Sequence, residues 1–529
     1  MNIHELFGQA LADSRAARFD AAEKKLLRLT KHPLNDAETA GVHQLLGMVY
    51  ASTGKFADAV PAFETAAAKN PTDASIASNL CNCLAATGRI DDAIAAGETA
   101  VLLAPRDADA HYNLAHALKQ RGDLSGAADH YRKTVDLNPT LAPAYNSLGV
   151  IHRQLNNLDE AISNFRKSVE IQPDYAEAHN NLGTALRHAR KPDEAVSSYV
   201  RALEISPDMP QFLCNLGRAY RDNNEFGQAI VNFSRALELE PGEKFTHEDL
   251  GHAYRDNGQL DAAIEQFDIA GTDVARAEAL RCLFAAGRYD SFYQRIDAQS
   301  DKIDLNIGAA AVCTYASEQL KRDNPHPFCP APQDFLHFGH LSAHLADPAA
   351  FIDQLIEELR AVPSLWDPIS STTQSGFQTQ GNLFDLPGEK IAALHAVLHK
   401  EVQAFRERFA DAECLLIKSW PEAFYLNGHS VRLQTSGHQT AHIHASGWLS
   451  GVVYLQLVPS DKEDEGAIVF GSDGYGHPLL TDDIAETVHR PVKGDIVFFP
   501  SSLFHRTIPI RQDGERIIAA FDLVPLPAN

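Results

Sequence analysis

The 529-residue chain has few sulfur-containing and indole side chains and no long hydrophobic run. It contains 3 Met, 3 Trp and 7 Cys, and the cysteines are scattered and odd in number. This pattern argues against a disulfide framework and favours a reducing compartment, so we expect a cytoplasmic protein. A membrane-spanning helix needs about eighteen or more consecutive apolar residues, and no such stretch occurs. The first residues form an amphipathic helical pattern without the apolar core or cleavage site of a signal peptide.

Positive charge is also scarce in this chain. Lys and Arg together number 46 against 70 Asp and Glu, which gives a formal net charge of −24. Binding to a nucleic-acid backbone needs a cationic face, and no basic stretch stands out, so nucleic acid is not an expected partner. A chain of this length is too long for one hydrophobic core, and we expect at least two domains.

The first half of the chain repeats every 34 residues without insertion or deletion. One column of the repeat is leucine, at Leu46, Leu80, Leu114, Leu148, Leu182, Leu216 and Leu250. Alanine and proline recur at the same spacing, and an aromatic ring recurs with Gly97 as its one exception. A glycine, alanine or cysteine follows each leucine, which lets two helices approach closely. Each unit is therefore predicted to be two helices, and the pattern resembles the tetratricopeptide repeat (TPR).

The repeat divides the chain into predicted domains. We expect a divergent helical cap at 1–36, seven TPRs at 37–272, and additional helices and a linker at 273–325. Stacked TPRs form an α-solenoid with a concave binding surface. A separate domain is predicted at 326–529.

The residue before each column leucine carries a second signal. The column reads Leu45, Asn79, Asn113, Ser147, Asn181, Asn215 and Asp249. Asparagine is a mediocre helix former, so its recurrence in a helix needs a reason. In a TPR this position faces the concave surface, and the column resembles the asparagine ladder of O-linked N-acetylglucosamine transferases. Such amides can hydrogen-bond an extended peptide backbone, so Asn79, Asn113, Asn181 and Asn215 are candidate partner-binding residues that line the groove without supporting the core.

The alternative interpretation of this column is a solvated polar groove that has no particular ligand. Both interpretations place a protein or peptide partner, where there is one, on the concave face.

The period ends at the proline-rich stretch "DNPHPFCPAPQDF" (323–335). Helices are expected at 348–361 and 387–409, with a polar loop at 367–384 between them. From residue 423 onward, short apolar runs alternate with turn signals, which is typical of a β-sandwich or a jelly-roll barrel.

Three histidines in this second half have the layout of a metal site. The run "HIHASGWLSGVVYLQL" begins with His442 and His444, whose side chains share one face if the run is a strand. His505 ends a second strand-like run. Two ligands at i and i+2 and a third from a distant strand are typical of ferrous oxygenases.

The residues around these histidines resemble the 2-oxoglutarate/Fe(II) oxygenase superfamily over 335–525. Arg516 follows His505 by eleven residues, and Tyr454 lies in "SGVVYL". The pattern H-x-H-x(5)-S-G-x-x-Y is closest to a bacterial and phage subgroup. The resemblance implies a double-stranded β-helix (jelly roll) that uses Fe(II), 2-oxoglutarate and O2. It also implies three metal ligands (His442, His444 and His505), with Arg516 and Tyr454 binding a carboxylate of 2-oxoglutarate.

His444 departs from the family pattern, because the first motif is usually H-x-D or H-x-E. We favour His444 as a ligand. Alternatively, it lies behind the metal and a carboxylate such as Asp473 completes the site, or the position stays open. Trp448 is expected either to shape the substrate entrance or to pack against an edge strand.

The combined prediction is an α-solenoid followed by a jelly-roll dioxygenase that hydroxylates a polypeptide, or a polypeptide-borne group, recruited by the TPR groove. One alternative is a small-molecule oxygenase that its TPRs dock into a complex. The other is a non-catalytic TPR scaffold with a degenerate oxygenase domain, an interpretation that the missing acidic ligand supports.

Overall fold

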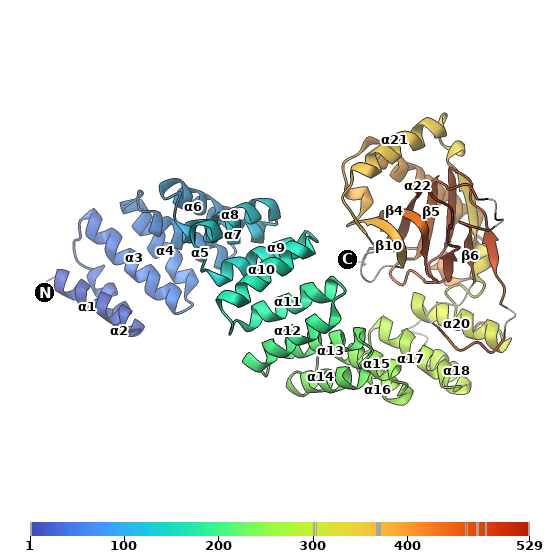
Figure 1. Ribbon diagram of the computed structural model, residues 1–529, viewed down its shortest axis with the longest axis horizontal. Helices are drawn as coiled ribbons and strands as arrows, with labels where there is room; N and C mark the ends of the chain where they lie inside the picture. The colour runs from blue at the N-terminus through green and yellow to red at the C-terminus, as the bar shows by residue number, and fades with distance from the viewer. Residues whose placement is uncertain are drawn as a thin grey trace. The chain divides into compact units, whose positions relative to one another are not determined.

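The computed structural model describes residues 3–299, 302, 304–366, 372–460, 462, 464–471, 476–481 and 484–526. The chain divides into two compact units, a first unit at 1–239 and a second unit at 240–529. Figure 1 shows the succession of helices in the N-terminal part of the chain and the sheets near the C-terminus. No helix within the described ranges combines the length and the apolar character that crossing a membrane requires.

The first unit is an α-solenoid of paired helices. Its helices are α1 (Ile3–Arg15), α2 (Phe19–Leu29), α3 (Asp36–Ser52), α4 (Phe56–Lys69), α5 (Ala74–Ala86), α6 (Ile90–Leu103), α7 (Ala108–Arg121), α8 (Leu124–Leu137), α9 (Ala142–Gln154), α10 (Leu158–Ile171), α11 (Ala176–His188), α12 (Pro192–Ile205), α13 (Pro210–Asp222) and α14 (Phe226–Leu239). Each helix packs against the next one along the chain, from α3 with α4 to α13 with α14. This confirms the prediction of two helices per repeat.

Where a glycine follows the column leucine, it receives the aromatic ring of the next helix. A Cβ atom added to Gly149 would lie 2.8 Å from the ring of Phe165, and one added to Gly183 would lie 2.8 Å from the ring of Tyr199. Both rings are fully buried. Because a larger side chain would displace the ring, the sequence spacing of small residue and aromatic residue fixes how the two helices of a repeat pack.

The repeat that lacks the ring is filled in another way. At Gly97 an added Cβ atom would lie 3.0 Å from Sγ of Cys81 and 3.0 Å from a methyl group of Leu114. The cysteine takes the small-residue position of its own repeat, and the leucine belongs to the next repeat. The exception in the aromatic column is therefore compensated by its neighbours, and the core stays closed.

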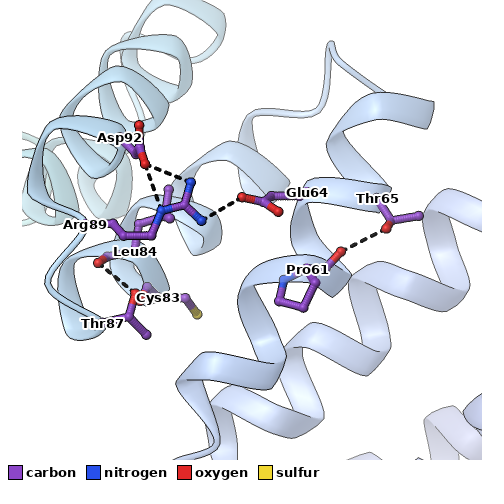
Figure 2. A network of polar contacts seen from close by, with 8 residues as sticks. All are labelled: Pro61, Glu64, Thr65, Cys83, Leu84, Thr87, Arg89 and Asp92. Atoms are coloured by element: carbon purple, nitrogen blue, oxygen red, sulfur yellow. Dashed lines mark hydrogen bonds and ion pairs between the residues drawn. The ribbon is translucent and has the colours of Figure 1, made fainter.

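Adjacent repeats are also linked at the surface by ion pairs, as Figure 2 shows for Arg89. Its guanidinium donates to Asp92 of its own helix at 2.8 Å and to Glu64 of the preceding repeat at 3.0 Å. All three side chains are exposed, and exposed pairs contribute about 0–1 kcal/mol each. The apolar contacts therefore dominate the stability of the stack.

The second unit begins with helices and continues into two antiparallel sheets. Its helices are α15 (Lys244–Asp256), α16 (Leu260–Ala270), α17 (Asp273–Ala285), α18 (Tyr289–Ala298), α20 (Ile307–Leu320), α21 (Pro348–Ala361), α22 (Glu389–Arg408) and α23 (Leu415–Lys418). The strands are β1 (His337–His340), β2 (Ser364–Trp366), β3 (Thr373–Thr379), β4 (Phe424–Gln439), β5 (Leu449–Gln456), β6 (Ile468–Phe470), β7 (Thr487–His489), β8 (Asp495–Pro500), β9 (His505–Thr507) and β10 (Arg516–Pro525).

The larger sheet has the strand order β1-β8-β5-β10-β4-β3-β2, and the smaller sheet has the order β7-β6-β9. Strand β5 is buried on both faces, which explains its continuous apolar sequence. Val453 contacts the core formed with α21 and α22, whereas Val452 and Tyr454 contact the core shared with β6. This arrangement of two facing antiparallel sheets is consistent with the predicted jelly roll.

Two local predictions for this region were wrong. The segment expected to be a polar loop at 367–384 contains β3, which pairs with β4. Its polar sequence hid a strand because β3 is held by backbone pairing with β4 and β2, which needs no apolar side chains. The residues around His442 are not a strand, since only His442 forms a bridge, with His505. The predicted helix at 348–361 is confirmed, and the one at 387–409 is present as α22.

A buried carboxylate ties α22 to the edge of the larger sheet. Glu401 of α22 accepts hydrogen bonds from Nε2 of His337 at 2.9 Å and from Nε2 of His344 at 2.5 Å. Hydrogen bonding by His337 outweighs the effect of burial and lowers the pKa of Glu401. The contact therefore fixes the helix against strand β1 through an ionised group.

Candidate metal centre

Backbone pairing brings the three predicted metal ligands together. His442 and His505 exchange two backbone hydrogen bonds, at 3.0 and 3.1 Å. The backbone N–H of His444 donates to the carbonyl of Ser501 at 3.0 Å, which fixes the second histidine beside the same segment. Residues more than sixty positions apart in the sequence thus form one cluster, as the sequence predicts.

The ring nitrogens of the three histidines converge. Their ligand atoms all lie within 4.8 Å of one another, and Nε2 of His444 lies 3.3 Å from Nε2 of His505. Two nitrogens that are each about 2.1 Å from one ion, at an angle between the right angle and the tetrahedral angle, lie about 3.0–3.4 Å apart. The observed separation fits that geometry.

The other nitrogen of each ring is held by the protein. Nδ1 of His442 lies 2.6 Å from the carbonyl oxygen of Thr440, and Nδ1 of His505 lies 3.1 Å from that of Leu503. Since a carbonyl oxygen only accepts, each Nδ1 carries the proton and donates it. The Nε2 lone pairs are consequently available for a metal ion, which is the usual arrangement behind histidine ligands.

Burial keeps two of these histidines neutral. It lowers the pKa of His442 to about 4, with a further contribution from the neighbouring His444. It also lowers the pKa of His505 well below its ordinary value, and the two other histidines act in the same direction. A neutral imidazole is the form that binds metal, so the cluster suits a cation at neutral pH.

A carboxylate lies directly behind His444. Nδ1 of His444 is 3.0 Å from one oxygen of Asp522 and 2.9 Å from the other, and Asp522 also accepts from the hydroxyl of Ser450 at 2.6 Å. Burial acts to raise the pKa of Asp522, but His444 and Ser450 outweigh it and lower the pKa. A negative charge is therefore present next to the cluster, on the Asp522 carboxylate that contacts Nδ1 of His444, and not on a residue of the cluster itself.

Asp473, the alternative acidic ligand, lies outside the described residues. Trp448 is 6% exposed, donates from Nε1 to the carbonyl of Leu416 at 2.9 Å, and contacts the ring of Phe328 edge to face. Of its two expected roles, packing is the one that these contacts show.

Arg516 is a buried cation that forms no ion pair with a described residue, and Tyr454 is its polar neighbour. Its side chain is 1% exposed, and none of its three guanidinium nitrogens has a hydrogen bond there. Its guanidinium carbon lies 5.1 Å from the ring centre of Tyr454, whose buried hydroxyl also has no hydrogen bond in the described part of the chain. Burial lowers the pKa of Arg516 and raises that of Tyr454 to about 12. Leaving such donors unpaired is costly, so the site is suited to an anion.

One internal cavity connects this cation to the histidine cluster. It is lined by Gln439, His444, Gly451, Val452, Tyr454, Ile468, Phe499, His505, Thr507, Arg516, Ile518 and Ala520. The lining places cation-binding imidazoles and an anion-binding guanidinium around one cavity. The chemistry of these residues therefore fits a ferrous ion at the histidines and a carboxylate, such as one of 2-oxoglutarate, at Arg516.

The asparagine column is more than a groove lining. The amide nitrogen of Asn113 donates to the hydroxyl of Ser78 at 2.9 Å. In the same way Asn181 donates to Asn146 at 3.0 Å and Asn215 donates to Asn180 at 2.9 Å. Each bond connects one repeat to the preceding one. The sequence predicted that these residues line the groove without supporting the core, and the structure adds that one amide N–H of each connects neighbouring repeats.

Asn79, the remaining candidate of the column, is half-buried on α5. Each amide of the column also carries a second N–H and a carbonyl oxygen, so stacking alone does not exhaust its hydrogen-bonding capacity.

Sequence reasoning missed Asp522 and the two serines that connect to it. Ser450 hydrogen-bonds both Asp522 and Ser501, at 2.6 and 2.7 Å. The available signal was a carboxylate inside the apolar run "RIIAAFDLVP", because an acidic residue is rarely buried without a partner.

Models of known families match both the helical array and the C-terminal part of the chain. A family model described as "Putative 2OG-Fe(II) oxygenase" matches residues 429–522. Models of the tetratricopeptide repeat match residues 7–74, 50–117, 108–141, 140–208 and 214–271. No curated protein matches the chain.

Several solved structures match part of the chain. A crystal structure of MamA is 26% identical, covers 31% of this chain and 95% of its own, and has a TM-score of 0.29. The TPR protein YrrB is 22% identical over 35% of this chain and 95% of its own, with a TM-score of 0.31. For Pseudomonas aeruginosa pilF the values are 17%, 37%, 88% and 0.34. At these TM-scores nothing about function follows from the likeness. The family models thus show tetratricopeptide repeats in the helical part of the chain and a domain described as "Putative 2OG-Fe(II) oxygenase" at 429–522.

Proposed function

We propose that the protein is an Fe(II)- and 2-oxoglutarate-dependent dioxygenase that hydroxylates a polypeptide substrate. The observation that carries this proposal is the buried Arg516, which forms no ion pair with a described residue and shares one cavity with His444 and His505. A fold retains an uncompensated buried cation at a cost of several kcal/mol, so a bound anion is its best explanation. The alternative is a degenerate oxygenase domain that serves only as a scaffold. Such a domain would bind no anion and would gain nothing from a buried cation.

The roles of the chain's own residues follow from their positions. His442, His444 and His505 would hold the ferrous ion through Nε2, while Thr440, Asp522 and Leu503 keep the rings oriented. Arg516 would bind the distal carboxylate of 2-oxoglutarate, and the hydroxyl of Tyr454 would donate to the same group. When bound, the iron and its cosubstrate supply the oxidising power for O2-dependent hydroxylation.

The polypeptide substrate is supported by the helical array. TPR stacks present a concave surface, and the asparagine column places an amide on it at each of several repeats. Neither a nucleic acid nor a membrane is part of the proposal. All seven cysteines are thiols in the structure, which suits the proposed cytoplasmic location.

The direct test is succinate formation and protein oxidation. The full chain is incubated in air with Fe(II), ascorbate and 2-oxoglutarate in host lysate, and succinate and +16 mass shifts of lysate proteins are measured. We expect both with the parent protein and neither with His442→Ala. The matched control is His438→Ala, because His438 is bonded through Nδ1 to Ser436 and lies outside the cluster.

Absence of succinate from the parent protein would refute the enzymatic proposal. Succinate without any oxidised protein would favour a small-molecule substrate instead.

A further inference from the structure

A second cavity in the second unit adjoins the candidate metal centre from another side. Its volume is about 170 Å³. It is lined by Asp273, Val274, Ala277, Glu278 and Arg281 of α17, by Leu305, Asn306, Ile307, Gly308 and Val312 at and within α20, and by Ile443 and Ala445. We call this cavity the junction pocket.

The lining of the junction pocket is mostly apolar. Val274 and Leu305 at its edge are 48% and 51% exposed, although large aliphatic side chains are normally covered. An apolar cavity of about 150 Å³ holds a benzene ring, so this one has room for one leucine, isoleucine or phenylalanine side chain. Its size and lining therefore fit a single apolar group.

A fixed carboxylate stands beside this apolar surface. Glu278 accepts from Arg281 at 3.3 Å and is also bonded to Arg255, which in turn pairs with Asp256 at 2.7 Å. These charges compensate one another, so the pocket does not select a charged side chain. The polar groups are instead suited to the backbone that carries an apolar side chain.

The position of Glu278 relates the junction pocket to the groove column. Glu278 stands nine residues before Gly287, which ends its helix with φ +68°. Asp249 stands nine residues before Gly258, with φ +76°, and Asn113 stands nine residues before Gly122, with φ +90°. Measured from the glycine that follows each helix, Glu278 takes the same position as Asn113 and Asp249 of the column, in a degenerate helical pair made of α17 and α18.

The opposite wall of the junction pocket is the metal-binding segment itself. Ile443 lies between His442 and His444, and Ala445 follows them. A side chain seated in the pocket would hold its peptide against the backbone that carries two of the three histidines.

We propose that the junction pocket binds one aliphatic or aromatic side chain of the polypeptide substrate and so sets which residue reaches the metal centre. This proposal rests on the function proposed above and adds a sequence preference to it. Burying a side chain of this kind stabilises binding enough to change affinity by about tenfold or more.

The test uses peptide binding to the full chain without iron. The probes are fluorescein-labelled dodecapeptide pools that share one fixed central residue and are randomised elsewhere, read by fluorescence anisotropy. Pools with fixed Leu, Ile or Phe are expected to bind at least about tenfold more tightly than pools with fixed Gly or Asp. The double variant Val274→Asp/Leu305→Asp should lose this preference, and Ala445→Leu, which fills the pocket without adding charge, should lose it as well.

The matched control is Val492→Asp, an exposed valine outside the pocket, which should keep the preference. A parent protein that does not distinguish the pools, or pocket variants that still prefer apolar residues, would overturn the proposal. Because these measurements need no iron, their failure is separable from failure of the enzymatic proposal, which succinate formation reports. If the protein selects apolar peptides but forms no succinate, the proposed peptide pocket is supported and the proposed enzymatic activity is refuted.

Discussion

Arg516 should make the second unit less stable than it would be with an apolar residue in its place. Its guanidinium is 1% exposed and has no hydrogen bond among the described residues. Replacing a buried charge that lacks good compensation by an apolar side chain of similar length is worth about 1–4 kcal/mol. We therefore expect Arg516→Met to raise the free energy of unfolding of the second unit by that amount when 2-oxoglutarate is absent.

Bound 2-oxoglutarate should make the parent protein more stable than Arg516→Met. A ligand present at 100 times its dissociation constant stabilises the folded state by about 2.7 kcal/mol. A buried charge-assisted pair contributes about 2–5 kcal/mol, so Arg516→Met should weaken 2-oxoglutarate binding by at least about tenfold. The parent protein should consequently gain stability from Fe(II) and 2-oxoglutarate under argon, while the variant should gain almost none.

Tryptophan fluorescence is a selective assay for this effect. All 3 tryptophans of the chain, Trp366, Trp420 and Trp448, belong to the second unit, so urea unfolding followed by their emission reports that unit alone. The matched control is Arg506→Met, whose side chain is 36% exposed and pairs with Glu486 at 3.5 Å. It should change neither stability nor cosubstrate response by more than about 0.5 kcal/mol.

The refuting result is equally specific. If Arg516→Met lowers the stability of the unit and 2-oxoglutarate still stabilises the variant as it does the parent, the guanidinium is a structural ion and the cosubstrate binds elsewhere.

Three further predictions concern the array, the helix contact and the metal centre. Gly149→Val should lower the stability of the first unit by about 1–3 kcal/mol because its side chain would meet a buried ring, whereas Gly227→Ala, which has open space, should not; circular dichroism during urea unfolding decides this. Glu401→Gln should cost about 2 kcal/mol at pH 7. In the parent protein the pKa of Glu401 is lowered in the folded state, chiefly by hydrogen bonding with His337. The stability that the ionised Glu401 contributes is therefore present above the unfolded pKa and is lost as pH falls through the folded pKa. The difference between variant and parent in urea unfolding should thus shrink below about pH 4.5, and a constant difference would contradict the argument. Asp522→Asn should weaken Fe(II) binding about tenfold in anaerobic titration while the unit stays folded, and unchanged affinity would show that the carboxylate behind the histidine ligand is dispensable.

The solenoid is determined by the sequence because its contacts are local. Each helix packs on the next, so a ring such as Phe165 and the glycine that receives it, Gly149, are close in the chain as well as in space. An uninterrupted 34-residue period therefore predicts how the helices pack, and the family models identify the same region as tetratricopeptide repeats. The identities of the three histidines, Arg516 and Tyr454 were likewise visible, since their spacing follows a family pattern.

What only the tertiary structure decided depends on contacts between residues far apart in the chain. Asp522 reaches His444 because β10 runs beside β5, and no local pattern reports that pairing. The strand β3 was missed because its polar residues gain their hydrogen bonds from β4 and not from their own sequence. The groove asparagines were predicted to face either a partner or solvent, and their bonds to the preceding repeat exist only once the repeats stack. Local periodicity thus determined the array, whereas the surroundings of the metal centre were decided by long-range pairing, because a buried charge or donor shows its partner only after folding.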